Sequence, residues 1–150
     1  MNRFFLGGTC AETTWRDELI EELKKFDCEW FNPVVDDWTP ECQQIEENEK
    51  NNKCNVHLYV ITPEIQGVYS IAEIVNSCWQ AQVYGTTVSD VVFCVIGEWN
   101  EQQLKSFNAM IKLCDNIAPG RFHGNILKSI KEVVKFMAYE DLIRIKKEYV

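Results

Sequence analysis

The chain has 150 residues, 46% of them hydrophobic and 25% charged, and its formal net charge is -8 at pH 7. This composition predicts a single globular domain over residues 1–150. The acidic balance argues against a nucleic acid polymer as partner, because phosphate backbones bind clustered Lys and Arg. No apolar run approaches the roughly 20 residues that cross a bilayer, and residues 1–3 lead into a strand pattern rather than a signal peptide. We therefore expect a cytoplasmic protein that does not bind membranes.

Strand patterns and helix patterns alternate along the chain. The strand patterns are expected at residues 2–6, 30–35, 54–62, 90–96 and 121–123. The helix patterns are expected at residues 14–26, 40–52 (a polar helix or loop), 70–84, 101–114 and 126–139, the last with a pattern that continues to residue 145. This alternation predicts βαβ units and a parallel sheet with helices on both faces. With right-handed crossovers the simplest strand order is 2-1-3-4-5, which is a flavodoxin-like (Rossmann-like) α/β fold.

Two local signals refine the first half of this pattern. Thr14 stands at the start of the first helix pattern with Asp17 three residues later, which is the spacing of a capping box. Asn32-Pro33 falls inside the second strand pattern. Because proline cannot donate a ladder hydrogen bond, this strand is expected to end early or to lie at an edge of the sheet.

Two glycines and a threonine follow the first strand pattern, at Gly7, Gly8 and Thr9. Glycines at this point allow a positive φ and the close approach of a ligand, and Thr9 adds a hydroxyl group. The same pair of glycines also occurs where a chain only makes a tight corner. Taken alone, this segment leaves both interpretations open.

Glu73 follows the third strand pattern, in the first turn of the helix expected from residue 70. The helix dipole favours an acidic residue there, so one interpretation is a structural helix-start glutamate. The other is a catalytic carboxylate, because ligands in open α/β sheets bind outside the carboxyl ends of the strands. In the expected order the first and third strands are neighbours, so Glu73 and the Gly7-Gly8 turn face one crevice. This coincidence favours the catalytic interpretation.

The seven cysteines are scattered through the chain, without a Cys-x-x-Cys pair and with an odd total. We therefore expect free, mostly buried thiols in a reducing compartment. His57 and His123 are too far apart in the sequence to form a recognisable ligand motif, so no metal site is expected.

Five segments together resemble the nucleoside 2-deoxyribosyltransferase-like family, which includes forms from bacteria and their phages. They fall within roughly the first hundred residues: Phe5-Leu6-Gly7-Gly8-Thr9, Thr14-Trp15-Arg16, Phe31-Asn32-Pro33-Val34-Val35, Val60-Ile61-Thr62-Pro63 and Gly67-Val68-Tyr69-Ser70-Ile71-Ala72-Glu73. The resemblance implies a flavodoxin-like fold and cleavage of an N-glycosidic bond by a glutamate nucleophile, with no metal or redox cofactor.

Carried over by position, Glu73 is the implied nucleophile, and Ser70 matches a small hydroxyl residue of the family. The family's transferases carry an aspartate six residues before the glutamate, which helps to hold the sugar, and related nucleotide hydrolases carry a serine there. In this chain the position is Gly67, which matches neither pattern. This difference tilts the expectation toward hydrolysis rather than transfer.

Cleavage of a glycosidic C–N bond requires two groups. A carboxylate beneath C1′ stabilises or captures the positively charged sugar, and a second acid assists departure of the base. Glu73 is expected in the first role. Asp36 and Asp37, at the end of the second strand pattern, are candidates for the second role, with a solvated loop pair as the alternative.

Three aromatic residues offer a face on which a base could stack. Tyr69, beside Ser70, is the preferred candidate, and Trp38 and Trp15 are the others. Trp15 also fits the inner stripe of the first helix, where it is a core residue.

Arg16 lies close to the glycine turn and is expected to hold a phosphate or a ribose hydroxyl. The alternative is a surface arginine near Glu12 or Asp17. The full set of expected substrate-binding residues is Gly7, Gly8, Thr9, Trp15, Arg16, Asn32, Tyr69 and Ser70.

The expected partner is a small nucleoside or nucleotide, and a homo-oligomer is compatible with the sequence. Two other functions stay open. One is an NAD-cleaving domain of the TIR type, which shares the sheet and a helix-borne glutamate; the other is a non-catalytic module that binds a nucleotide-derived signal, with Gly67 as the mark of lost chemistry. A flavin carrier is disfavoured, because no Ser/Thr-rich phosphate loop follows the first strand.

Overall fold

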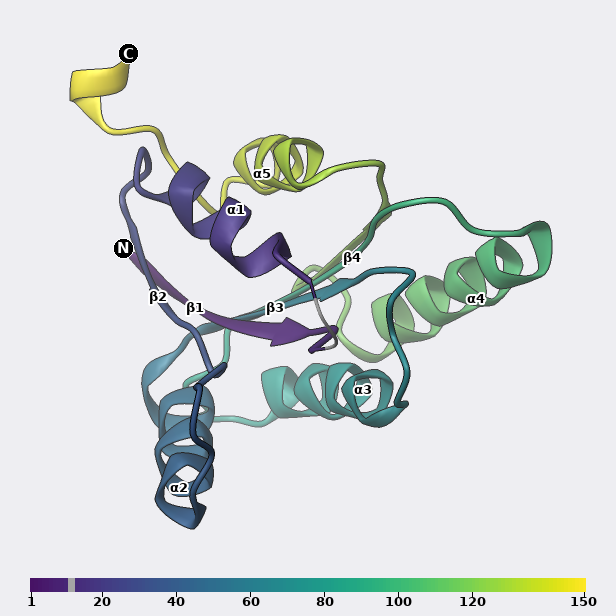
Figure 1. The fold of residues 1–150 in the computed structure, drawn as a ribbon, viewed down its shortest axis with the longest axis horizontal. Coiled ribbons are helices and arrows are strands. Elements are labelled where there is room, and N and C mark those ends of the chain that lie inside the picture. Colours follow the sequence, from purple (N-terminus) through teal and green to yellow (C-terminus); the bar gives the residue numbers. More distant parts are fainter. Residues whose placement is uncertain (11–12) are drawn as a thin grey trace.

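The computed structural model describes residues 1–10 and 13–150 and contains a five-stranded parallel sheet. The strand order is β2-β1-β3-β4-β5, which confirms the predicted flavodoxin-like α/β fold (Figure 1). The strands are β1 (Asn2–Gly8), β2 (Cys28–Phe31), β3 (Val56–Ile61), β4 (Asp90–Val95) and β5 (Phe122–Ile126). The helices are α1 (Trp15–Leu23), α2 (Pro40–Asn48), a π-helical turn η1 (Glu49–Lys53), α3 (Tyr69–Gln82), α4 (Glu101–Ile117), α5 (Ile130–Tyr139) and a short 3₁₀ turn η2 (Lys147–Tyr149).

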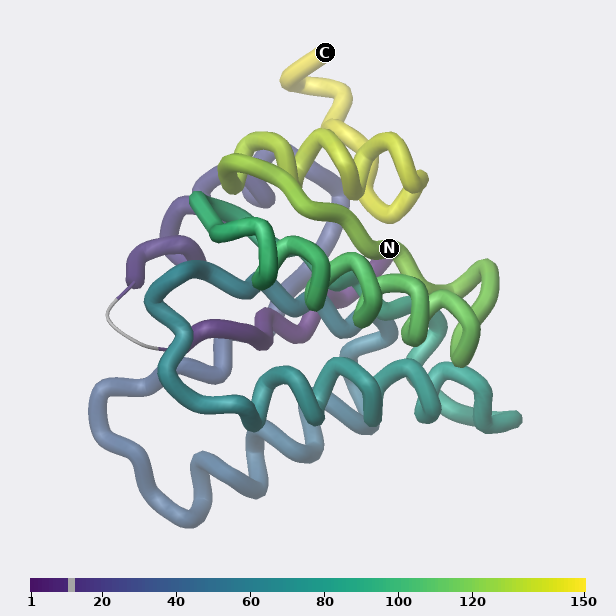
Figure 2. Tube along the Cα trace, turned by 90° about the vertical axis from the view of Figure 1, so that its right-hand side faces the viewer, coloured from purple at the N-terminus to yellow at the C-terminus, as the bar shows by residue number. Residues whose placement is uncertain are grey.

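The sheet is covered on both faces, and each face has its own apolar core. Helices α1 and α5 cover one face, with Leu19 and Met137 fully buried against it. Helices α3 and α4 cover the other face, where Ile74 and Cys114 are fully buried. Figure 2 shows α5 and α3 on opposite sides of the strands. Every residue of β3 is buried, as expected for a central strand between two layers.

The two glycines near the amino terminus belong to the strand itself. The sequence placed them in a turn after residue 6, whereas β1 continues to Gly8, which pairs with Val60 of β3. A Cβ at Gly7 would lie 2.6 Å from the ring of Tyr59, and a Cβ at Gly8 would lie 2.1 Å from the carbonyl oxygen of Val60. Gly8 also has a φ of 117°. The glycines are therefore required for the contact between β1 and β3.

Strand β2 ends early, as the proline predicted. It stops at Phe31, before Asn32-Pro33, and lies at the edge of the sheet. The predicted continuation to Val35 was wrong, because a chain that contains Pro33 cannot continue the ladder beside β1. The predicted cap of α1 was also wrong: Thr14 is the N-cap residue, but its side chain makes no capping hydrogen bond.

The C-terminal segment does not extend the last helix. Helix α5 starts after Ser129, whose hydroxyl accepts a hydrogen bond from the N–H of Glu132, and it ends at Tyr139. Asp141 then adopts a φ of 62°, and the chain returns to form an antiparallel bridge between Ile145 and Phe26. The buried apolar residues after 139 thus pack against the core that α1 and α5 cover. Because they are buried there, they are apolar, and their spacing continued the helical pattern in the sequence.

Helix α2 and the turn η1 connect β2 to β3 on the side of the sheet that carries α3. Helix α2 has no buried residue, and in Figure 1 it projects away from the sheet. The turn η1 is held to the sheet by an ion pair of 3.0 Å between Arg3 and Glu49. Among the described residues, no helix is both long and apolar enough to cross a membrane.

Candidate active site

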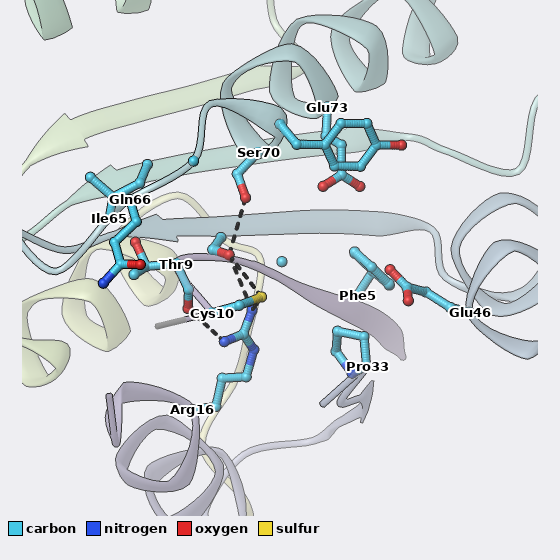
Figure 3. Close-up of a pocket in the computed structure, with 14 residues that line it drawn as sticks. Phe5, Thr9, Cys10, Arg16, Pro33, Glu46, Ile65, Gln66, Ser70 and Glu73 are labelled. Carbon is cyan, nitrogen blue, oxygen red and sulfur yellow. Dashed lines mark hydrogen bonds between the residues drawn. The ribbon is translucent and has the colours of Figure 1, made fainter. Parts of the chain in front are cut away.

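A cavity of about 460 Å³ opens at the carboxyl ends of β1 and β3, beside α3 (Figure 3). Its lining comes from six parts of the chain: the end of β1, the first turn of α1, the segment after β2, helix α2, the loop that leads into α3, and the first two turns of α3. The cavity lies at the point where the order of the strands reverses, which is where ligands bind in open α/β sheets. It brings Gly7, Gly8 and Glu73 together, as the sequence predicted.

Glu73 is the fifth residue of α3, so it lies in the second turn of the helix rather than in the first. The dipole effect is strongest in the first turn, and the interpretation of Glu73 as a helix-start residue therefore loses its basis. Its Oε2 atom lies 2.6 Å from Nζ of Lys50, a residue of η1. The two side chains are only 14% and 12% exposed. A nearly buried carboxylate at a cavity wall, paired with one cation, is available for chemistry through its other oxygen.

Glu46, from α2, supplies a second carboxyl group to the same cavity. Burial raises the pKa of Glu46, and the negative charge of Glu73 raises it further, against the opposing charges of Lys50 and Arg16. A carboxyl group with a raised pKa in a cavity is suited to hold and donate a proton. Glu46 was not predicted as a site residue, because it stands in a Glu-rich polar stretch with no apolar pattern. The available signal was the four-residue spacing between Glu46 and Lys50, which places them on one side of a helix.

The hydroxyl groups near the end of β1 hold the backbone in place. The hydroxyl of Ser70 donates a hydrogen bond of 3.1 Å to the carbonyl of Gly8, and that of Thr9 accepts a hydrogen bond of 2.9 Å from the N–H of Thr62. Figure 3 shows Ser70 and Arg16 approaching this stretch from opposite sides. Both hydroxyl groups thus fix the backbone at the end of β1, which lines the cavity.

Arg16 is a buried residue and not a surface arginine. Its guanidinium donates to the carbonyl of Leu6 at 3.0 Å and to that of Thr9 at 2.7 Å. Burial lowers the pKa of Arg16, and neighbouring groups, Cys10 first among them, oppose this shift. Glu12, the other neighbour considered, lies outside the described residues. Arg16 therefore braces the end of β1 while its charge faces the acidic cavity.

The three aromatic residues that were candidates for stacking on a base lie in different surroundings. Trp15 is 4% exposed, and its indole N–H donates a hydrogen bond of 2.9 Å to the carbonyl of Thr9, so it is a core residue and not a platform for a base. Tyr69 lines the cavity and is 76% exposed, which leaves its ring free. Trp38 is exposed and is not part of the lining.

Three polar candidates from the segment after β2 lie away from the cavity lining. Asp36 and Asp37 are exposed, and neither lines the cavity. The side-chain oxygen of Asn32 accepts a hydrogen bond of 3.1 Å from the N–H of Val34, so it shapes the turn after the strand. Pro33 is the residue of this segment that reaches the lining.

Gly67 lines the cavity and has open space beside it. No heavy atom within the described chain lies within 4 Å of the place where a Cβ would stand. The position where the resembling transferases carry an aspartate is therefore unfilled but not blocked.

The described residues include no group of three or more His, Cys, Asp or Glu side chains that could hold a metal ion. The cysteines in this part of the chain are free, and Cys54, Cys78, Cys94 and Cys114 are buried, as predicted.

Comparison with known proteins gives one match. A family model described as nucleoside 2-deoxyribosyltransferase like matches residues 2–98. These residues include every part of the cavity lining. Searches among curated proteins and among solved structures found no significant match.

Proposed function

The chain belongs to the nucleoside 2-deoxyribosyltransferase-like family, and from this premise we propose that it cleaves the N-glycosidic bond of a nucleoside or nucleotide, with Glu73 as the nucleophile. The observation that carries the proposal is the pairing of two carboxyl groups of different character in one cavity. Glu73 is held beside a cation, whereas burial and the charge of Glu73 raise the pKa of Glu46. A carboxylate held beside a cation, together with a carboxyl group whose pKa is raised, is an arrangement that glycosidic cleavage uses.

The proposed reaction has two steps. The C1′–N bond breaks, its electron pair leaves with the base, and a carboxylate oxygen of Glu73 forms a bond to C1′. Glu46 gives its proton to the departing base, so that the base leaves neutral. Water then attacks C1′, the C1′–O bond to Glu73 breaks, and the proton of the water passes to the Glu46 carboxylate. Both side chains return to their starting states.

The acceptor in the second step is proposed to be water. Gly67 contributes no side chain that would hold the sugar of a glycosyl-enzyme against a second base. The base is released in the first step in either case, so the appearance of free sugar in an amount equal to the free base measures this directly. If a second base is incorporated faster than sugar accumulates, the enzyme is a transferase.

The test of the nucleophile is the variant Glu73→Gln, assayed against a panel of nucleosides and nucleotides by mass analysis of bound and released species. The substitution keeps size but removes the charge, and loss of such preorganised stabilisation costs on the order of a hundredfold to a thousandfold in rate. Glu47→Gln is the matched control, because Glu47 is exposed and does not line the cavity.

Each alternative function has its own signature in the same assay. Turnover by Glu73→Gln within a few-fold of the parent would contradict the proposal. Recovery of a tightly bound, unchanged ligand would indicate a binding module, and release of nicotinamide from NAD would indicate a TIR-type activity.

A further inference from the structure

Lys50 occupies an unusual place, on a π-helical turn between α2 and β3. Its ammonium group lies 2.6 Å from Oε2 of Glu73 and 5.5 Å from the centre of the Phe5 ring. Both members of the ion pair are nearly buried. The neighbouring Lys53 of the same turn pairs with Glu49 at 3.7 Å, but its side chain is 57% exposed. One of the two lysines of this turn is thus directed at the proposed nucleophile.

The backbone of Lys50 is anchored by a chain of three buried side chains. The carbonyl of Lys50 lies 2.6 Å from Nε2 of His57, and Nδ1 of His57 lies 2.8 Å from the hydroxyl of Ser77. The hydroxyl of Tyr59 lies 2.7 Å from the same oxygen of Ser77. Tyr59, Ser77 and His57 are each fully buried.

The direction of this chain follows from its end. A carbonyl oxygen can only accept, so Nε2 of His57 carries the proton and Nδ1 accepts from Ser77, which in turn accepts from Tyr59. Burial lowers the pKa of His57 to about 4, so the ring is neutral at neutral pH and this tautomer is retained. The backbone of Lys50 is therefore anchored by buried groups of β3 and α3, in addition to the Arg3–Glu49 ion pair that holds the same turn.

The charges around Glu73 come from several elements. Lys50 is in contact, Arg16 and Glu46 face the same cavity from α1 and α2, and Tyr69 lies one turn earlier on α3. Arg16 is engaged with backbone carbonyls. Among the described residues, Lys50 is the cation in direct contact with the Glu73 carboxylate.

We propose that Lys50 is a positioning residue, which holds Oε2 of Glu73 so that Oε1 is the oxygen presented to C1′, and that the chain Tyr59–Ser77–His57 helps to fix the turn that carries Lys50. This inference rests on the proposed function. A buried ion pair by itself adds little to stability, because the cost of desolvating both charges offsets their attraction. An anchored pair at the cavity wall, by contrast, orients a reacting group.

The test compares Lys50→Met, which removes the charge but keeps the length, with Lys50→Arg, which keeps the charge. Lys53→Met is the matched control on the same turn. The chemical shift of the carboxyl carbon of Glu73, assigned by its absence in Glu73→Gln, is compared between the parent and the variants at one pH by carbon-13 NMR. We expect this signal to move in Lys50→Met, because the ammonium group that contacts Oε2 is lost, and to return close to the parent position in Lys50→Arg. Lys53→Met should match the parent.

Kinetics then separate positioning from a purely structural role. Lys50→Met should lower kcat by about tenfold to a hundredfold with KM changed only a few-fold, and Lys50→Arg should restore most of this loss. Ser77→Ala, a milder change than removal of His57, should shift kcat in the same direction by a smaller factor. Equal losses in Lys50→Met and Lys53→Met would contradict the proposal.

The NMR arm needs no turnover, so it distinguishes the two ways of failing. A parent that cleaves no substrate, combined with a moved Glu73 signal in Lys50→Met, would overturn the proposed function and leave the pairing intact. An unchanged Glu73 signal in Lys50→Met overturns the positioning role, whether or not the parent is active.

Discussion

Gly8 and Gly67 both border the cavity, but only at Gly8 do the backbone conformation and the surroundings require a glycine. Gly8 combines a φ of 117° with a carbonyl oxygen 2.1 Å from the place of a Cβ, whereas Gly67 has open space. We predict that Gly8→Ala lowers the free energy of unfolding by about 2 kcal/mol or more, and that Gly67→Ala changes it by about 0.5 kcal/mol or less. Urea unfolding of both variants measures the difference. Equal stabilities would mean that β1 and β3 separate easily at Gly8.

The raised pKa of Glu46 leads to a second prediction at the scale of a residue. A general acid must be protonated, so kcat/KM should fall as pH rises through the pKa of Glu46, which burial and the charge of Glu73 raise. Glu46→Gln should lower the rate by about a hundredfold or more and remove this basic limb. Substrates whose base leaves readily without a proton should be less affected. A basic limb that persists in Glu46→Gln assigns the acid to another group.

The residues of the site were predictable only in part. Glu73, Tyr69 and the end of β1 were found because they follow apolar strands whose carboxyl ends must meet. Trp15 and Arg16 were candidates for contact with substrate, with a core position as the alternative for Trp15, and both donate to the carbonyl of Thr9. Sequence spacing places such residues near the cavity but does not tell whether their polar atoms face a ligand or the backbone.

At the scale of elements, an ionic cluster ties β4, β5 and the end of α5 together. His123 lies 2.8 Å from Asp90 and 3.4 Å from Glu140. Burial alone lowers the pKa of His123, but the hydrogen bonds to Asp90 and Glu140 outweigh it, and the net pKa is raised. Burial likewise tends to raise the pKa of Asp90, and the bonds from His123 and Ser89 lower it overall.

The sign of the pH dependence follows from these two shifts. A raised histidine pKa contributes stability below the unfolded value of about 6.5, and this contribution is lost as pH rises through the folded value. The lowered pKa of Asp90 contributes stability above about 3.8, which is lost in stronger acid. We predict that His123→Gln is more destabilising at about pH 5 than at about pH 8.5. Thermal unfolding at the two values tests this, and a larger effect at the higher pH would contradict it.

The elements themselves were predicted better than their ends. The order of the sheet follows from the alternation of patterns and from the handedness of crossovers, which depend on long stretches of sequence. The ends depend on single residues. Strand β1 runs through its glycines because Gly8 pairs with Val60, and α5 ends where Asp141 adopts a positive φ. Local propensity predicts neither the pairing nor the positive φ.

At the scale of the whole molecule, the walls of the cavity differ in how firmly they are packed against the core. One wall consists of β1 and α3, which contribute buried residues to the apolar cores; another includes α2, which has no buried residue. Glu46 lies on this weakly packed wall, and Lys50 follows it on the turn anchored by His57. The polar sequence of α2 gave no sign of its role, because the helix has no buried apolar stripe.

This asymmetry makes a prediction for hydrogen exchange. Local opening of a segment with few buried contacts costs a free energy near zero, whereas opening of the core costs as much as global unfolding. The amides of α2 should therefore exchange faster than those of α3. A nucleoside or nucleotide bound between Glu46 and Glu73 contacts both walls and should slow exchange in α2. Helix α5, on the other face of the sheet, is the internal control and should not respond. If a ligand that binds the protein protects α5 as strongly as α2, the slowing reflects global stabilisation, and the acid on α2 does not touch the ligand.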